Sequence, residues 1–123
     1  MFGSVIAQPG GVSASCNIDA VCRVDSLGAA YVQAKNAVAH MVFNLYTTSG
    51  GIHGTYICTG TLLNDTTAST QVPYFYSAAH CIDSQTVANT LNTYWGYENT
   101  GCAPSDARKT NPLTGGADSR RTA

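Results

Sequence analysis

Charged side chains are scarce in this sequence. Only 11% of the 123 residues are Asp, Glu, Lys or Arg, and six basic residues against seven acidic ones leave a net charge of −1. A chain so close to neutral gives no electrostatic reason to expect nucleic acid or a charged membrane as its partner. Hydrophobic residues still make up 44% of the chain, which is not the composition of a disordered segment. We expect one folded domain with a polar, weakly charged surface.

Long apolar runs are also lacking. No stretch approaches the roughly 18 consecutive apolar residues that a membrane-spanning helix needs. The first eight residues, MFGSVIAQ, are apolar, but they carry no basic leader and are too short for a secretory signal peptide. We therefore expect residues 1–10 to be a propeptide remnant or an artificial start, with no signal peptide present in this chain.

The sequence has an odd number of cysteines, five. In an exported protein a cysteine left over after pairing suggests that its partner lies elsewhere. One of the five is therefore expected to remain unpaired in this chain. They are Cys16, Cys22, Cys58, Cys81 and Cys102.

Alternating side chains predict β-strands in the middle of the chain. Over residues 37–46 apolar side chains alternate with the others, which is the period of a strand that faces a core on one side. We expect further strands over residues 54–63 and 90–97. Gly60 falls inside the second of these, and a glycine within a strand usually marks the close approach of another backbone.

Helical periodicity is limited to short segments. Apolar residues recur every three to four positions over residues 26–36, which predicts a short helix with Ser26 as its N-cap. Residues 82–88 could form one further helical turn. Residues 103–123 have no periodicity, contain Pro104 and Pro112, and carry four of the six basic residues. We expect this segment to be a mobile polar tail that leads toward a second domain.

The clearest chemical pattern is YFYSAAHC at residues 74–81, preceded by CTGTLL at residues 58–63. Aromatic residues suited to a half-buried strand run into two alanines, a histidine and a cysteine. The alanines suit a tight turn in which no bulky side chain crowds the imidazole. The pattern places His80 at the end of a strand, one hairpin away from Cys58.

These residues resemble the histidine signature of the trypsin-like serine endopeptidases, which reads hydrophobic, Ser or Thr, Ala, small, His, Cys. The segment 77–81 matches this signature, whereas Tyr76 departs from it because the family usually has an aliphatic residue there. Two further stretches, GVSASCNIDAVC at residues 11–22 and YWGYENTGC at residues 94–102, are similar to the bacterial lysyl endopeptidases. The resemblance runs from Gly11 to about Cys102.

The resemblance implies a fold and a set of disulfides. Residues 11–102 would form an all-β, antiparallel, trypsin-like β-barrel, the N-terminal barrel of a two-barrel fold. Cys58 would pair with Cys81, and Cys22 with Cys102. The partner of Cys16 would lie in the second barrel.

The resemblance also implies a reaction. His80 would be the general base of a Ser-His-Asp triad in a secreted endopeptidase that acts on polypeptides, because histidine can accept and return a proton near neutral pH. No cofactor and no metal are implied. The triad aspartate and serine would lie in the missing C-terminal barrel, and neither Asp106 nor Asp118 lies at the start of a hydrophobic strand. This chain alone is expected to be inactive.

Other interpretations of the same residues are weaker or less specific. Zinc coordination by Cys58, Cys81, His80 and His53 would lack the close ligand spacing of most zinc sites. A nucleophilic Cys81 conflicts with its implied disulfide. His40 and His53 are interpreted as structural or solvent-exposed residues. The alternative function is a protease-derived β-barrel that serves as a non-enzymatic binding or structural module.

Overall fold

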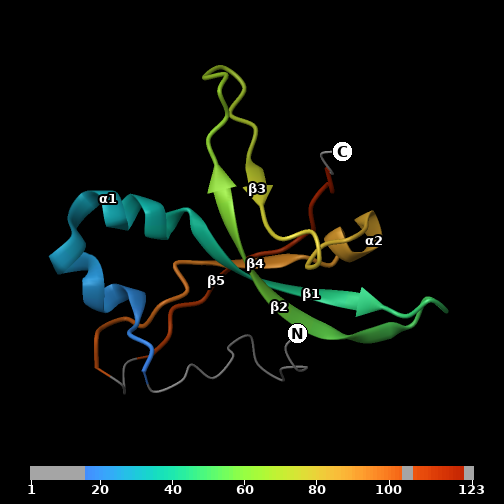
Figure 1. Cartoon of the computed structure of the whole chain (residues 1–123), viewed down its shortest axis with the longest axis horizontal. Coiled ribbons are helices and arrows are strands. Elements are labelled where there is room, and N and C mark those ends of the chain that lie inside the picture. The colour runs from blue at the N-terminus through green and yellow to red at the C-terminus, as the bar shows by residue number, and fades with distance from the viewer. Residues whose placement is uncertain (1–15, 104–106, 121–123) are drawn as a thin grey trace.

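The computed structural model of the protein describes residues 16–103 and 107–120. The expected propeptide remnant at residues 1–10 and Asp106 lie outside the described residues. Five strands form one antiparallel sheet in the order β3-β2-β1-β4-β5 (Figure 1). The strands are β1 (Val38–Tyr46), β2 (Ile52–Leu63), β3 (Tyr74–Tyr76), β4 (Asn92–Trp95) and β5 (Asn111–Leu113). The helices are the 3-10 helix η1 (Ala20–Arg23), α1 (Val24–Asn36) and the single turn α2 (Gln85–Ala88).

The long hairpin of β1 and β2 is the framework of the sheet. Its register runs from Val38 opposite Thr61 to Tyr46 opposite Ile52. The strands predicted over residues 37–46 and 54–63 are therefore confirmed, although β2 begins two residues earlier than expected.

None of the helices in the described part of the chain is long and apolar enough to cross a membrane.

The hydrophobic core lies on one face of this sheet. Alternate residues of β1 point toward it, and Met41 and Phe43 are fully buried. The chain between β3 and β4 returns over the same face and buries Val87 and Leu91 there. Burial on one side of β1 is what the period-two pattern predicts, because successive side chains of a strand point to opposite faces.

Gly60 allows a close approach, as the sequence predicts, but the approaching group is a side chain and not a backbone. A Cβ atom built on Gly60 would collide with the ring of Phe75 and would lie 3.1 Å from Sδ of Met41. The absence of a side chain at this position lets the Phe75 ring lie against β2. The ring in turn contacts Trp95 edge-on, with 5.7 Å between ring centroids.

The sheet does not close into the expected barrel within the described residues. Its edge strands, β3 and β5, have three residues each and stand at opposite ends of the strand order. The antiparallel β-architecture and two disulfides are present. Closure is absent because each edge strand pairs with one neighbour only.

The first helix is longer than predicted and begins differently. It covers Val24–Asn36, and Gly28 interrupts it with φ 72°. Ser26 is not its N-cap, since the Ser26 hydroxyl donates a hydrogen bond to the Arg23 carbonyl at 3.1 Å. A capping interaction occurs earlier, where Asp19 accepts a hydrogen bond from the Val21 amide at the start of η1.

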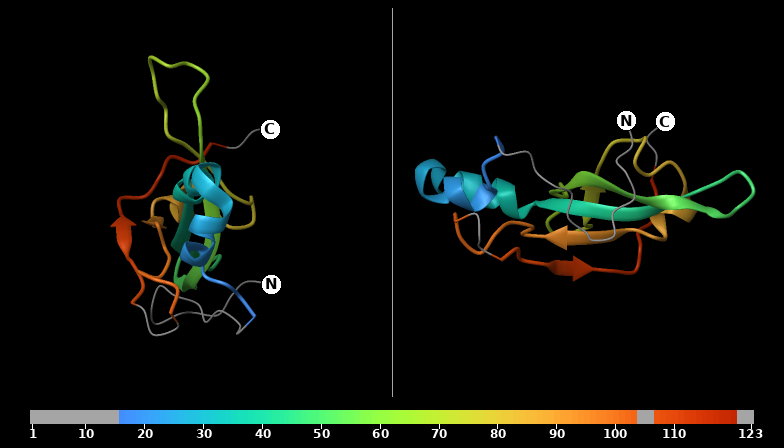
Figure 2. Two further views of the ribbon diagram at one scale, coloured as in Figure 1. Left: turned by 90° about the vertical axis from the view of Figure 1, so that its left-hand side faces the viewer. Right: turned by 90° about the horizontal axis from the view of Figure 1, so that it is seen from below.

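The segment 107–120, which the sequence predicts to be part of a mobile polar tail, contains a short strand. Its strand β5 pairs with β4, placing Thr93 opposite Leu113 and Trp95 opposite Asn111, and the right-hand view of Figure 2 shows β5 alongside β4 at the sheet edge. Further along, the Ala117 amide donates to the Ala88 carbonyl at 3.0 Å. A segment without a periodic side-chain pattern can still form a strand, because backbone pairing to an existing strand edge does not require such a pattern.

Gly116 is expected to be essential for this docking. It has φ +75°, and a Cβ atom there would lie 2.6 Å from the Asn89 carbonyl oxygen. We expect Gly116→Ala to lower the free energy of unfolding by about 1–3 kcal/mol and to speed hydrogen exchange at the Ala117 amide. Gly115→Ala is the matched control, because Gly115 also has a positive φ but no atom lies within 4 Å of its Cβ position. Equal losses in the two variants would contradict the steric argument.

A candidate catalytic site around His80

The loop 77–81 is attached to β2 at both of its ends. Cys81 forms a disulfide with Cys58, with 6.3 Å between their Cα atoms. Ser77 donates a hydrogen bond from its hydroxyl to the Thr59 carbonyl at 2.8 Å. A further hydrogen bond from the Cys81 amide to the Ala78 carbonyl, at 2.9 Å, closes the turn between them. His80 therefore lies in a short turn held against two consecutive residues of one strand.

His80 itself is exposed, whereas the adjacent Cys81 is buried in the core. A ring nitrogen of His80 and the sulfur atoms of Cys58 and Cys81 lie within 4.8 Å of one another. The position follows β3, as the sequence pattern predicts. The imidazole is thus accessible to an incoming group while its backbone is anchored through the disulfide.

This geometry bears on the two alternatives for the cysteines. The sulfurs of Cys58 and Cys81 are bonded to each other, so neither can be a thiolate metal ligand or a nucleophile in the oxidised chain. His53, the fourth ligand of that hypothesis, is in β2 and has its Nδ1 hydrogen-bonded to the Tyr56 hydroxyl at 2.7 Å.

The second disulfide joins Cys22 to Cys102, 80 residues apart, and so fixes η1 to the chain beyond β4. These two disulfides are the pairs that the resemblance implies. Cys16 has no disulfide partner and is exposed. Asp118, which the sequence did not favour as a triad member, is exposed as well.

His40 occupies the sheet face opposite the core. Its ring stacks on Tyr97, with 4.5 Å between centroids, and Arg108 lies 4.9 Å from the centroid of the Tyr97 ring. Nε2 of His40 is buried and has no hydrogen-bond partner among the residues that the structure describes. Burial, together with the nearby Arg108 charge, lowers the pKa of His40. A neutral His40 is therefore part of the folded structure.

Stability should accordingly depend on pH through His40. A histidine whose pKa is lower in the folded than in the unfolded chain binds protons more readily when unfolded, so stability is present above about pH 6.5 and declines as the pH falls toward the folded-state pKa. We expect the free energy of unfolding to drop between pH 7 and pH 5, and His40→Phe to flatten that slope. Denaturant titrations at several pH values measure it, and an unchanged slope in His40→Phe would assign the effect to another group.

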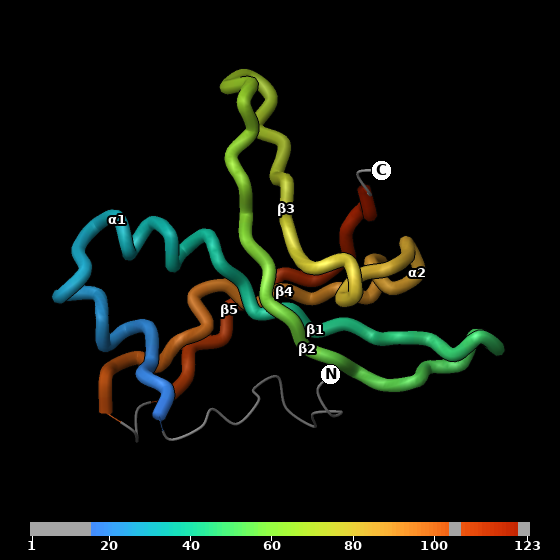
Figure 3. The backbone as a smooth tube through the Cα atoms, viewed as in Figure 1, coloured from blue at the N-terminus to red at the C-terminus, as the bar shows by residue number. Residues whose placement is uncertain are grey.

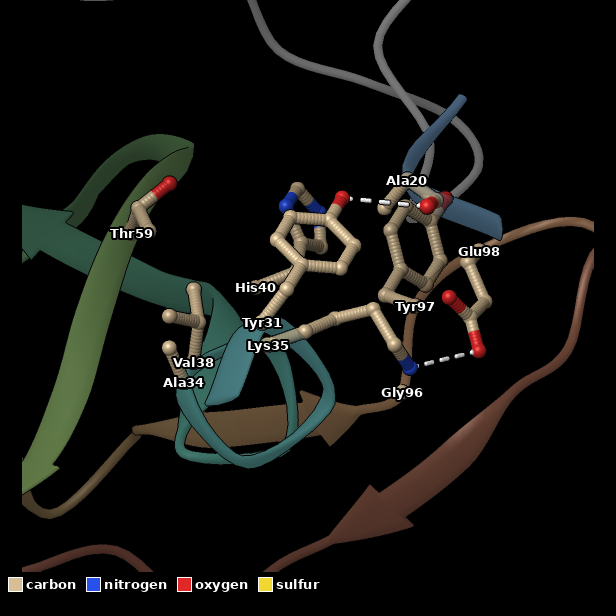
Figure 4. Close-up of a pocket in the computed structure, with 10 residues that line it drawn as sticks. All are labelled: Ala20, Tyr31, Ala34, Lys35, Val38, His40, Thr59, Gly96, Tyr97 and Glu98. Carbon is tan, nitrogen blue, oxygen red and sulfur yellow. Dashed lines mark hydrogen bonds and ion pairs between the residues drawn. The ribbon is translucent and has the colours of Figure 1, made fainter. Parts of the chain in front are cut away.

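A hollow of about 460 Å³ lies beside His40, between α1 and the chain after β4 (Figure 4). Glu98 at its rim is 6% exposed and accepts hydrogen bonds through Oε1 from Lys35 at 2.9 Å and from Lys109 at 3.2 Å. Burial opposes ionisation of Glu98, but the two lysines outweigh it and hold the pKa of the carboxyl below its ordinary value. Its described lining residues are Ala20, Tyr31, Ala34, Lys35, Val38, His40, Thr59, Gly96, Tyr97 and Glu98.

His80 does not line this hollow, so the hollow is separate from the candidate catalytic histidine. Sequence reasoning missed the grouping of His40, Tyr97 and Arg108, because these residues come from three distant segments. It also missed the hydrogen bond from Ser77 to the Thr59 carbonyl, although Ser77 is part of the histidine signature. The family resemblance implied that Cys58 and Cys81 are paired next to His80, and the three residues lie together in the structure.

Comparison with known proteins places the chain in a family of peptidases. Residues 10–123 match the model of the lysyl endopeptidase C-terminal domain, and the chain belongs to this family. A curated relative, a lysyl endopeptidase of Pseudomonas aeruginosa, is 48% identical over 111 residues, which is 88% of this chain. The match covers 23% of the relative, so the chain spans about a quarter of that protein's length. No solved structure matches the chain at a significant level.

Proposed function

We propose that this chain is the histidine-bearing part of a secreted serine endopeptidase, and that His80 is the general base of its Ser-His-Asp triad. The observation that carries the proposal is the loop 77–81, which presents an exposed imidazole from a turn tied to β2 by a disulfide and a hydrogen bond. Membership of the lysyl endopeptidase family supports the reaction class.

The chemistry assigned to His80 is proton transfer. As the serine hydroxyl attacks the peptide carbonyl, the imidazole accepts the hydroxyl proton and the C–N bond then breaks as the same proton passes to the leaving amine. Water repeats the sequence on the acyl-enzyme. The His80 imidazole must be accessible to the reacting groups at each step, because both the serine and the leaving amine must reach one ring nitrogen.

The remaining machinery would come from a second, C-terminal barrel in a longer protein. That barrel would supply the serine, the aspartate that orients the imidazole, and the oxyanion-hole amides. Exposed apolar residues on the β2–β3 hairpin support such a covering, and the hairpin projects from the sheet in Figures 1 and 2. They are Leu62, Leu63, Val72, Tyr74 and Tyr76.

Polypeptides are the proposed substrates. The name of the Pseudomonas relative connects it with lysyl bonds, and we propose the same preference here. The side chains that would select lysine are assigned to the second barrel, as is the disulfide partner of Cys16.

The test is digestion of a denatured protein mixture by the complete, secreted protein, followed by mass spectrometry of the new C-termini. We expect cleavage after lysine and covalent labelling of one serine by a serine-directed phosphonate, with heat-inactivated protein as the control. Cleavage after other residues would retain the endopeptidase and reject the lysine preference. Intact substrates and no labelling would instead favour the non-enzymatic module.

A further inference from the structure

At the end of β3, backbone pairing to β2 stops and a side-chain hydrogen bond to β2 follows. The ladder between β2 and β3 ends at Tyr76, which pairs with Thr61. In Figure 3 the chain then turns away from the strand direction and runs toward α2. The next residue, Ser77, makes the hydrogen bond to the Thr59 carbonyl at 2.8 Å. A hydroxyl therefore holds the chain at the start of the turn that carries His80.

The two attachments of this turn have different mechanical roles. The disulfide holds Cys81, directly after His80, to Cys58. The Ser77 hydroxyl holds the other end to the neighbouring residue of the same strand. Without the Ser77 hydrogen bond, residues 77–80 would be held only by the β-ladder that ends at Tyr76 and by the disulfide at Cys81. With that hydrogen bond, the first residue of the turn is itself held to β2, beyond the point where the ladder ends.

We propose that Ser77 is a positioning residue for His80, and this inference rests on the proposed function. Its hydroxyl does not take part in proton transfer. It fixes the direction in which the turn presents the imidazole, so that the ring nitrogen meets the serine hydroxyl and the leaving amine. Displacing a catalytic group by about 1 Å can lower the rate by about 10²-fold, so loss of one anchoring hydrogen bond should be visible in turnover.

The experiment compares Ser77→Ala, Ser77→Thr and Ser26→Ala in the complete protein. Ser26 is the matched control, because its exposed hydroxyl also donates to a backbone carbonyl, that of Arg23, far from the turn in sequence. We expect kcat of Ser77→Ala to fall about 10- to 100-fold with KM nearly unchanged. Threonine keeps a hydroxyl donor, so Ser77→Thr should stay within about threefold of the parent protein.

A serine-directed phosphonate separates misplacement from partial unfolding. If Ser77 positions His80, the variant should label to the same final extent as the parent but with a lower rate constant, because its serine is less well activated. Partial unfolding would lower the final extent instead and would overturn the inference. Should Ser77→Ala fail to fold, Ser77→Cys replaces it, since a thiol is a weak hydrogen-bond donor of similar size.

Three results would count against Ser77 as a positioning residue. These are unchanged kcat in Ser77→Ala or in its cysteine substitute, no rescue by threonine, and an equal loss in Ser26→Ala. A different result would contradict the proposed function, namely full activity in a protein that lacks His80. A protein that needs His80 but tolerates Ser77→Ala would keep the proposed function and reject this inference.

Discussion

Replacing His80 with alanine in the complete protein is expected to lower kcat by about 10⁴- to 10⁶-fold, as removal of a triad member does in serine proteases. Without the imidazole, no group accepts the serine proton during attack or returns it to the leaving amine. The exposed position of His80 makes a large structural loss unexpected. Initial rates on a lysyl peptide amide, with circular dichroism as the check on folding, measure the effect.

His53→Ala is the control for the His80 variant. His53 is also exposed, but its ring is stacked on Tyr56 and hydrogen-bonded to it. We expect this variant to keep nearly full turnover. Comparable rates in the two variants, with both proteins folded, would remove His80 from the proposed mechanism.

The second large effect is expected on removing the disulfides, and the two bonds should differ in their consequences. Chain-entropy arguments give about 3.4 kcal/mol for a loop of 23 residues and about 4.5 kcal/mol for one of 80 residues. Replacing both Cys22 and Cys102 by alanine should therefore cost more stability than replacing Cys58 and Cys81. Hydrogen exchange at the buried Met41 and Phe43 amides reports these free energies of opening.

Turnover should follow the opposite order. Loss of the Cys58–Cys81 bond releases the end of the turn next to His80, so kcat of the folded protein should fall about 10- to 100-fold. Loss of the Cys22–Cys102 bond leaves that turn attached, and kcat per labelled serine should stay close to that of the parent protein. Equal losses in the two double variants would mean that the Cys58–Cys81 bond serves stability alone.

Local patterns predicted the parts of the fold that they encode. The alternation over residues 37–46 identified β1 because one face of that strand is buried, and the turn at residues 77–81 followed from its small residues and histidine signature. β5 escaped prediction because its three residues are exposed and contain Pro112, so its position depends on the edge of β4. The contact between His40 and Tyr97 escaped it because no local rule connects residues so distant in sequence.

The difference between the expected barrel and the open sheet of the structure has a similar physical origin. Strand periodicity specifies which side chains face a core, but it does not specify how many strands pair. β3 and β5 are each three residues long and pair on one side only. The expectation of a closed barrel over residues 11–102 came from the family resemblance and not from the strand pattern.

Affinity alkylation tests the central claim about His80 most directly. The complete protein is treated with a peptidyl chloromethyl ketone that ends in lysine, and the modified histidine is identified by peptide mapping. A general base next to the substrate carbonyl should be alkylated in step with the loss of activity, so we expect one added peptidyl group on His80 and none on His40 or His53. Full inactivation with an unmodified His80, or alkylation of another histidine in its place, would contradict the account.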